Sequence, residues 1–457
     1  MPPLRRTDVV LDSVKRLQRM GASANLVNLL QKQHPSDLAE LFSELSDKDR
    51  RSTFTLLLDH HSHLAMEALI EYGAEPAAVL LADHSPDRIA SWLQELPSDD
   101  AAALIDELPD DLSDVVLEQM RPRESGEVEN LLDYAEQTAG RIMNPTVFAL
   151  SEDLTAGEAI QALQGSREVE MVFYLYVVDE RRHLVGVVSL RRLLLVARET
   201  PLQRIMTTDL ISARVDTDQE EVAQDVANYN LLAIPVVDDQ NRLVGTITVD
   251  DVIDIIKDEA TEDIYRLAGV SGDEHVFSPA GESMRKRIPW LLVNLLTATA
   301  AALVVRAFQA TIDQVVALAV FMTIVASMGG NAATQTLTII VRGIALGELT
   351  WGNSRKAVFK EALVGLGNGL TLGTVGALVA WGLSGNLYLG LILAGAMVVN
   401  LLVAAIAATL IPIALRALKI DPALASAVFI TTLTDVFGFF AFLGLATLFL
   451  PYLEPMS

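Results

Sequence analysis

Hydrophobic residues are spread unevenly along the 457-residue chain, and their pattern divides it into two parts. After Arg287 five apolar stretches are almost free of charged residues, and we predict membrane spans at 288–308, 315–341, 362–383, 388–415 and 426–450. Each is long enough to cross about 30 Å of hydrocarbon at about 1.5 Å per residue. The sequence therefore predicts an α-helical transmembrane domain of five helices over 285–457.

The chain before these stretches has the leucine periodicity of amphipathic helices through residues 8–135. Pro-Asp helix starts recur weakly about every 50 residues, in His34-Pro35-Ser36-Asp37 and in His84-Ser85-Pro86-Asp87. This pattern is typical of a short helical solenoid. We therefore expect an acidic, all-α superhelical N-terminal domain over 1–137.

Residues 141–260 contain an internal duplication. Arg141-Ile142-Met143 recurs 63 residues later at 204–206, and Leu184-Val185-Gly186 recurs 59 residues later at 243–245, which predicts an insertion in the first copy within about 165–171. Each copy reads helix, strand, short turn, strand, helix, and the pair resembles a tandem of α/β cystathionine-β-synthase (CBS) modules. Such modules commonly bind adenine nucleotides or act as regulatory dimerisers. We place them at 138–200 and 201–257, followed by a connecting helix at 258–284.

Charge separates the same two parts of the chain. Residues 281–457 contain 10 Lys/Arg and 7 Asp/Glu out of totals of 34 and 59, so residues 1–280 contain 24 and 52. A formal charge near −28 on the first part argues against nucleic acid as a partner, because phosphate binding needs a basic surface. It fits cation binding or simple solubility. The chain has no cysteine, which excludes disulfides and thiolate metal sites.

The distribution of Lys and Arg predicts the orientation of the spans. These residues precede the first span and follow the second and the fourth, whereas the loops 309–314 and 384–387 and the tail 451–457 contain none. The N-terminus lacks the apolar core of a cleaved signal peptide. We expect an integral protein of a bacterial-type cell (inner) membrane, with the N-terminal half in the cytosol and the C-terminus outside.

Polar residues inside the predicted spans indicate an ion pathway. Asp435 is the only acidic residue within the five stretches and lies about ten residues into the fifth, near the midplane. An ionisable group there is costly and usually marks an ion pathway, although a protonated or Arg-paired structural Asp is the alternative. The other candidates are Gly329, Gly330, Asn331, Thr334, Gln335 and Thr431. Hydrogen bonds between helices, or from hydroxyls to their own helix, are the alternative explanation for these six.

The ligands that these side chains offer are hard oxygen and amide groups. They suit Mg²⁺, Ca²⁺ or Mn²⁺ better than soft metals. Mg²⁺ gives up its water reluctantly, so one carboxylate can bind the hydrated ion through its water shell. A symmetric dimer would place two copies of Asp435 at one axis and strengthen cation selection.

A run of acidic residues continues from the second CBS copy toward the first span. It comprises Asp250, Asp251, Asp254, Asp258, Glu259, Glu262 and Asp263. A solvated acidic face is the ordinary explanation, but so many like charges repel one another, and bound cations would relieve that repulsion. Asp99 and Asp100 of the N-terminal domain could face these carboxylates across an ion, or serve only as helix caps and surface charges.

Four strings, taken together and in order, are similar to the MgtE family of magnesium channels. They are Met328-Gly329-Gly330-Asn331 with Thr334-Gln335, Ile420-Asp421-Pro422-Ala423-Leu424-Ala425-Ser426, Thr431-Thr432-Leu433-Thr434-Asp435, and Ala260-Thr261-Glu262-Asp263-Ile264-Tyr265. The resemblance covers nearly the whole chain. Thr323 and Ala333 depart from it, since the family often has proline and glycine at these positions.

The resemblance implies a homodimer with a pore on its axis, where Asp435 binds hydrated Mg²⁺ with help from Asn331 and the Gly329-Gly330 region. It implies that Asp421 meets the connecting helix through bound Mg²⁺. The matching helix positions are Asp251, Asp254, Glu259 and Glu262, with Asp218 and Glu220 as further candidates. Cytosolic Mg²⁺ would then close the pore by binding the closed state better. The resemblance also implies ATP as a ligand of the CBS pair, with Tyr174 as the candidate contact.

We therefore predict a Mg²⁺ channel or transporter for magnesium uptake, with membrane lipids and a second copy of the chain as partners. A transporter of another divalent cation (Co²⁺, Mn²⁺, Ni²⁺ or Ca²⁺) is the first alternative, and a nucleotide-sensing CBS membrane protein is the second. We expect no enzyme, because the sequence contains no P-loop, nucleophile elbow, zinc-protease or dinucleotide-binding motif.

Overall fold

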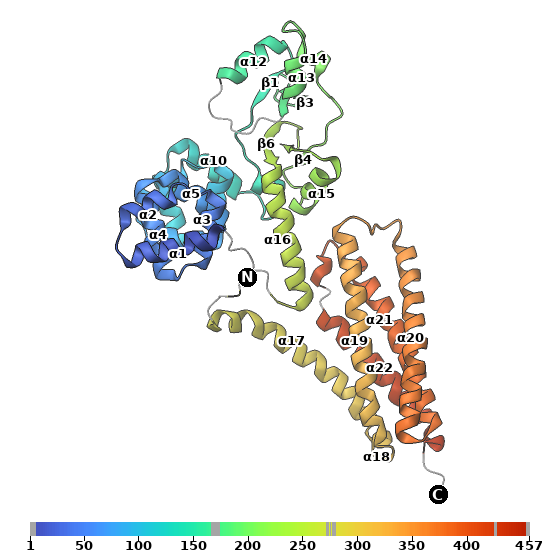
Figure 1. The fold of residues 1–457 in the computed structure, drawn as a ribbon. Coiled ribbons are helices and arrows are strands. Elements are labelled where there is room, and N and C mark those ends of the chain that lie inside the picture. The colour runs from blue at the N-terminus through green and yellow to red at the C-terminus, as the bar shows by residue number, and fades with distance from the viewer. Residues whose placement is uncertain are drawn as a thin grey trace. The chain divides into compact units, whose positions relative to one another are not determined.

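The chain forms two compact units, Met1–Ile255 and Ile256–Ser457, in the computed structural model (Figure 1). The structure describes residues 6–165, 174–270, 274, 276, 280–424 and 427–453. Of the segment 165–171, in which an insertion was predicted, only Gly165 is among the described residues. Ala425 and Ser426 of one family-like string also lie outside them.

The first unit begins with a helical domain, which confirms the all-α prediction. Its helices are α1 (Arg6–Arg19), α2 (Ser23–Leu30), α3 (Pro35–Glu44), α4 (Asp47–His60), α5 (Ser62–Tyr72), α6 (Ala74–Leu81), α7 (Pro86–Leu93), α8 (Ser98–Asp106), α9 (Asp110–Gln119) and α10 (Pro122–Leu132). Proline is the first residue of both α3 and α7, the two members of the weak repeat. It is tolerated there because the first N–H of a helix has no partner within that helix.

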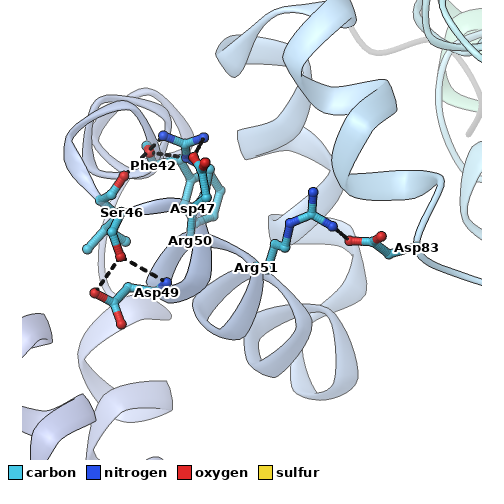
Figure 2. A network of polar contacts seen from close by, with 8 residues as sticks. Phe42, Ser46, Asp47, Asp49, Arg50, Arg51 and Asp83 are labelled. Carbon is cyan, nitrogen blue, oxygen red and sulfur yellow. Dashed lines mark hydrogen bonds and ion pairs between the residues drawn. The ribbon is translucent and has the colours of Figure 1, made fainter. Parts of the chain in front are cut away.

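Short polar contacts fix the ends of these helices, as the start of α4 illustrates (Figure 2). The Ser46 hydroxyl accepts a hydrogen bond from the backbone N–H of Asp49 at 3.3 Å and donates one to its carboxylate at 2.8 Å. Arg50 donates from Nε to the carbonyl of Phe42 at 2.6 Å, and Arg51 pairs with Asp83 beyond α6. These contacts fasten α4 to the segments on both sides of it.

The rest of the first unit is a pair of small α/β modules. The first contains α11 (Ala139–Ile142), β1 (Ala149–Ser151), α12 (Ala156–Gly165), β2 (Tyr174–Val178), β3 (Leu184–Ser189) and α13 (Leu190–Leu195). The second contains α14 (Leu202–Ile205), β4 (Ala213–Arg214), α15 (Gln219–Tyr229), β5 (Ala233–Val237), β6 (Leu243–Thr248) and the start of α16 (Val249–Ala268). Each sheet has a parallel pair followed by an antiparallel pair with the same register irregularity. The first strands, β1 and β4, were not predicted, because three and two residues are too few to show a period.

The repeated motifs pack across the duplication. A Cβ atom added to Gly186 would lie 2.5 Å from Sδ of Met206, and one added to Gly245 would lie 2.4 Å from Sδ of Met143. The start of each copy therefore rests on the last strand of the other copy. Since only glycine leaves room for that methionine, the Arg-Ile-Met and Leu-Val-Gly motifs recur together.

The second unit contains five helices that are long and apolar enough to cross a membrane, as predicted. Its elements are α17 (Ala280–Ala307), α18 (Gln309–Gln314), α19 (Ala317–Ala345), α20 (Ser354–Ser384), α21 (Leu387–Ala417), η1 (Pro422–Leu424), α22 (Ala427–Leu448) and η2 (Leu450–Tyr452). The segment 309–314, expected to be a loop, is the short helix α18. The segment 258–284, expected to be one connecting helix, is divided: α16 ends at Ala268, Gly269 follows at φ +70°, and α17 begins at Ala280.

Glycines of α20 let this helix lie directly against the backbone of α21. A Cβ at Gly365 would be 2.8 Å from the carbonyl oxygen of Leu401, and one at Gly369 would be 2.8 Å from Cα of Val398. Gly367, on the same helix, has no atom within 4 Å of such a Cβ. The glycine-rich stretch therefore serves close helix packing on one face only.

We predict that Gly369→Ala destabilises the protein by about 1–3 kcal/mol, because the added methyl group meets a backbone that cannot move aside cheaply. The matched variant Gly367→Ala should be neutral or slightly stabilising, since alanine is the better helix former. Thermal unfolding of the detergent-solubilised protein measures both. Equal unfolding temperatures for the two variants would contradict the packing described here.

Candidate functional site

Asp435 lies in the third turn of α22, and its side chain is partly exposed on the surface of a predicted span. Its carboxylate has no hydrogen-bond donor and no cation as a partner among the described residues of the chain. The alternative of an Arg-paired structural Asp therefore finds no support in the structure. A carboxylate at this depth needs water, an ion or a second protein surface beside it.

The threonines that precede Asp435 bond to their own helix. Thr431 and Thr432 donate to the carbonyl of Val428 at 3.2 and 2.8 Å, and Thr434 donates to the carbonyl of Thr431 at 2.8 Å. Each hydroxyl proton is thereby used, and the oxygen lone pairs remain as acceptors. These groups are suited to accept hydrogen bonds from the water shell of a cation.

The α19 candidates divide into a packed side and an exposed side. Gly329 is buried against Asn400 of α21, and a Cβ there would lie 2.2 Å from the amide nitrogen of Asn400. Gly330 approaches α22, with its added Cβ 3.3 Å from Cγ2 of Thr431. Gly329 therefore has a packing role here, and Gly330 brings α19 next to the helix that carries Asp435.

The exposed side of α19 carries the remaining polar candidates, Asn331, Thr334 and Gln335. Thr334 donates to the carbonyl of Gly330 at 3.0 Å. Asn331 and Gln335 are four residues apart and share a helix face, and both are exposed although they lie in the middle part of a span. A polar face at this depth is costly against lipid and requires water or a second protein surface.

Glu361 is a buried carboxylate that the sequence analysis missed. It lies in α20, is only 3% exposed, and accepts a hydrogen bond from Thr336 of α19 at 3.2 Å. Lys360 also contacts it, at 2.5 Å. The predicted third span began at residue 362, one residue too late to include it.

Four carboxylates gather in the first unit where α8 and α16 begin. Asp99 and Asp100 belong to the first turn of α8, and Asp250 and Asp251 to the first turn of α16. Burial, Asp100 and Asp251 together raise the pKa of Asp99 to about 8. Burial, Asp251 and Asp250 likewise raise the pKa of Asp100 to about 7. Their negative charges are therefore poorly compensated.

Neighbouring contacts hold this acidic group in place. Asn144 donates to Asp99 at 3.3 Å, and the Thr248 hydroxyl donates to Asp251 at 2.7 Å. Arg141 pairs with Asp106 at the end of α8, at 2.6 Å. In the described part of the chain, no three acidic or histidine side chains stand close enough to chelate one ion. The oxygen donors suit Mg²⁺ in kind, since that ion often keeps several waters between itself and protein carboxylates.

A second acidic group lies in the second unit, where the end of α16 meets the loop before α22. Arg266 pairs with both Glu262 and Asp421, and Asp421 also accepts a hydrogen bond from the N–H of Ala423 at 2.7 Å. Burial, Asp421 and Glu259 raise the pKa of Asp263 to about 6. The structure thus brings Asp421 to α16, as the family resemblance implies. Arg266, the cation that joins them, was not among the residues predicted from the sequence.

The end of α16 also packs onto the transmembrane helices. Leu267 contacts a cluster of buried residues from α19, α21, η1 and α22 that includes Ala333, Ala408 and Ile430. A Cβ at Gly269 would lie 3.6 Å from Val428 of α22. The end of α16 therefore rests on a group of helices that includes those carrying Asn331 and Asp435.

The other predicted site residues have separate surroundings. Asp218 caps α15 by accepting from the N–H of Glu220 at 2.8 Å, and Glu220 accepts from Gln224 at 3.3 Å. Asp254 contributes to the raised pKa of Asp251, which burial dominates, and Asp258 is exposed. Tyr174 begins β2 beside Tyr176, whose hydroxyl is 3.1 Å from that of Thr246 in the other CBS copy.

Family comparisons match the same parts of the chain. Residues 322–445 match the MgtE family, described as divalent cation transporter, and residues 33–137 match the MgtE intracellular N domain. Residues 139–199 and 202–258 each match the CBS domain. The Met1–Ile255 unit and the five apolar helices therefore belong to a membrane protein with a cytosolic N-terminal region.

Individual relatives agree with these matches. The magnesium transporter MgtE of Thermus thermophilus is 38% identical over 72% of this chain and 74% of its own length. That of Enterococcus faecalis is 36% identical over 72% and 73%. The crystal structure of the cytosolic domain of the Mg²⁺ channel MgtE in complex with ATP is 36% identical, with a TM-score of 0.50, over 54% of this chain and 99% of that one. These relatives are named as transporters or channels and not as enzymes, and the chain belongs to the MgtE family.

Proposed function

We propose that this protein carries Mg²⁺ across the cell membrane into the cytosol through a path lined by α19 and α22. The observation that carries the proposal is the unpaired carboxylate of Asp435, next to hydroxyls whose lone pairs remain available. Asp435 attracts the cation, and the threonine and amide oxygens accept hydrogen bonds from its waters. The relatives named as magnesium transporters support Mg²⁺ as the ion.

The working unit in this proposal is a homodimer with the path on its axis and the C-terminus outside. The polar faces of α19 and α22 remain uncovered in the single chain, although lipid is a poor neighbour for Asn331, Gln335 and Asp435. A second copy related by a two-fold axis would oppose the same residues to one another. Water and cations between the two faces would then satisfy them.

Closure by cytosolic Mg²⁺ follows from the two acidic groups. The carboxylates of α8 repel those at the start of α16, and Asp421 and Asp263 face Glu259 and Glu262 near its end. Bound Mg²⁺ would supply positive charge to both of these groups. The closed arrangement is favoured because it binds the ion better, and the packed end of α16 carries the effect to α19 and α22.

ATP is the second cytosolic ligand that we propose, between the two CBS copies. Tyr174 is partly buried at the start of β2, beside the contact between Tyr176 and Thr246 that joins the copies. The cytosolic domain of a relative, the Mg²⁺ channel MgtE, was crystallised in complex with ATP. An aromatic side chain at this place can stack on adenine.

We predict that Asp435→Asn reduces Mg²⁺ flux into liposomes to that of empty liposomes, because Asp435 is the only carboxylate in the described residues of α19 and α22. The control Asp313→Asn makes the same change on the exposed short helix α18 and should transport normally. Normal flux through the Asp435→Asn variant would remove the pore assignment. Flux of Co²⁺, Mn²⁺, Ni²⁺ or Ca²⁺ without Mg²⁺ in the wild type would instead move the proposal to another divalent ion.

We predict that Asp99→Asn combined with Asp100→Asn raises the cytosolic Mg²⁺ concentration needed for half closure by about ten-fold or more, since charge-assisted contacts are worth about 1.5–3 kcal/mol each. The double variant Asp110→Asn, Asp111→Asn removes two exposed carboxylates from α9 and should close like the wild type. Flux at a series of Mg²⁺ concentrations on the cytosolic face measures the difference. An unchanged concentration in the first double variant would remove this sensor site.

The proposed closure by Mg²⁺ should depend on pH through Asp99 and Asp100. Because the pKa values of Asp99 and Asp100 are raised, the folded protein holds protons there that Mg²⁺ must displace. Wild-type closure should therefore need less Mg²⁺ at about pH 8.5 than at about pH 6.5. Without Mg²⁺, the contribution of these two groups to stability is present below about pH 4 and is lost as the pH rises through about 7 and 8. Both effects should be much smaller in the double variant.

We predict that Tyr174→Ala weakens ATP binding by about ten-fold, because stacking on one base is worth about 1–3 kcal/mol. Tyr229→Ala, a change at an exposed tyrosine of α15, is the control. Equilibrium binding of radiolabelled ATP to the purified full chain measures both. Equal affinities would place the nucleotide elsewhere, and no binding to the wild type would remove ATP from the proposal.

A further inference from the structure

Arg266 occupies the place where the proposed function needs a cation. It extends from the last turn of α16 and pairs through Nη2 with Glu262, on its own helix. Through Nη1 it pairs with Asp421, 155 residues away in the loop before α22. One guanidinium therefore already joins the helix and the loop that regulatory Mg²⁺ is proposed to join.

The surroundings of Arg266 are strongly acidic. Glu259 and Asp263 lie near the same pair, and burial together with Asp421 and Glu259 raises the pKa of Asp263 to about 6. Although burial opposes the charged guanidinium, the hydrogen bond and charge of Asp421 raise the pKa of Arg266. Arg266 is therefore a permanent positive charge among four carboxylates, and its side chain is 31% exposed.

A guanidinium and a hydrated Mg²⁺ cannot use the same carboxylate oxygens at once. Binding of Mg²⁺ by Asp421 and Glu262 requires that Arg266 release both of them. Because Arg266 is attached to the same chain, it competes at a high effective concentration that does not change with conditions outside the protein. A doubly charged ion can still displace it, since the ion gains twice the charge against the same carboxylates.

We propose that Arg266 is a tethered competitor of regulatory Mg²⁺, which sets the Mg²⁺ concentration at which the protein closes. The inference rests on the proposed closure by cytosolic Mg²⁺ and names the residue that adjusts it. When Mg²⁺ is scarce, Arg266 keeps the end of α16 beside the α21–α22 loop in spite of the repulsion among the four carboxylates. When Mg²⁺ is abundant, Arg266 is released to solvent.

The test compares Arg266→Gln, Arg266→Lys and Lys257→Gln in the full chain. Arg266→Gln removes the competitor, and Arg266→Lys keeps the charge but loses the fork that spans two carboxylates. Lys257→Gln removes one positive charge from an exposed position of the same helix. For each protein, the Mg²⁺ concentration that gives half of the maximum rise in unfolding temperature is measured, and half closure of flux is measured beside it.

We expect Arg266→Gln to lower both Mg²⁺ concentrations about five-fold, which corresponds to about 1 kcal/mol. Arg266→Lys should lower them less, and Lys257→Gln should leave them within about two-fold of the wild type, because exposed charges are screened. An unchanged or raised value in Arg266→Gln would overturn the inference, and so would an equal shift in Lys257→Gln.

The wild type distinguishes this failure from that of the proposed function. If Mg²⁺ changes neither the unfolding temperature nor the flux of the wild type, closure by Mg²⁺ itself is wrong. If the wild type responds and Arg266→Gln responds at the same concentration, only the role of Arg266 is wrong. Arg266→Lys keeps the test valid if the glutamine variant does not fold, because it retains the charge.

Discussion

Carboxylates that are held close together or away from water need a compensating positive charge. This constraint recurs at three places in the protein. In the first unit it appears as raised pKa values of Asp99 and Asp100. At the end of α16, beside the loop before α22, Arg266 supplies that positive charge. In the transmembrane part Asp435 has no partner among the described residues. The three places differ mainly in how the charge is supplied: by a proton, by an arginine, or, in the proposed function, by the transported ion.

The acidic group at the end of α16 lies beside closely packed helices of the second unit. Glycines at 365, 369 and 373 fasten α20 to α21, and Gly329 and Gly438 enclose Asn400 of α21. α20 and α21 therefore meet backbone to backbone, whereas α19 and α22 meet α21 through the Asn400 side chain, and such close packing resists deformation. Leu267 of α16 rests on the same group of helices. In the proposed closure, a change of charge at the end of α16 would therefore act on a closely packed group of helices.

The sequence allowed the architecture to be predicted because each part had a strong period or a strong composition. Five apolar stretches, the duplicated Arg-Ile-Met and Leu-Val-Gly strings, and the Pro-Asp helix starts each correspond to elements in the structure. Contacts between residues that are far apart in the sequence could not be predicted in this way. Nothing in the sequence pattern distinguished Gly329, which packs on Asn400, from Gly330, which approaches Thr431. Glu361 and Arg266 were missed because their partners, Thr336 and Asp421, lie 25 and 155 residues away.

The two acidic groups differ in the positive charge that compensates them when Mg²⁺ is absent. The carboxylates of α8 and the start of α16 have hydrogen-bond donors beside them, but no cation of the described residues pairs with Asp99, Asp100 or Asp251, so protons are their available compensation. The group around Asp421 contains its own cation, which no change of pH near neutrality removes. In the proposed closure, protons and Mg²⁺ would therefore exchange at the first group, whereas an arginine and Mg²⁺ would exchange at the second. A protein that uses both can remain assembled when Mg²⁺ is low, since the second group is compensated at all times, and can still respond when Mg²⁺ rises, since the first is not.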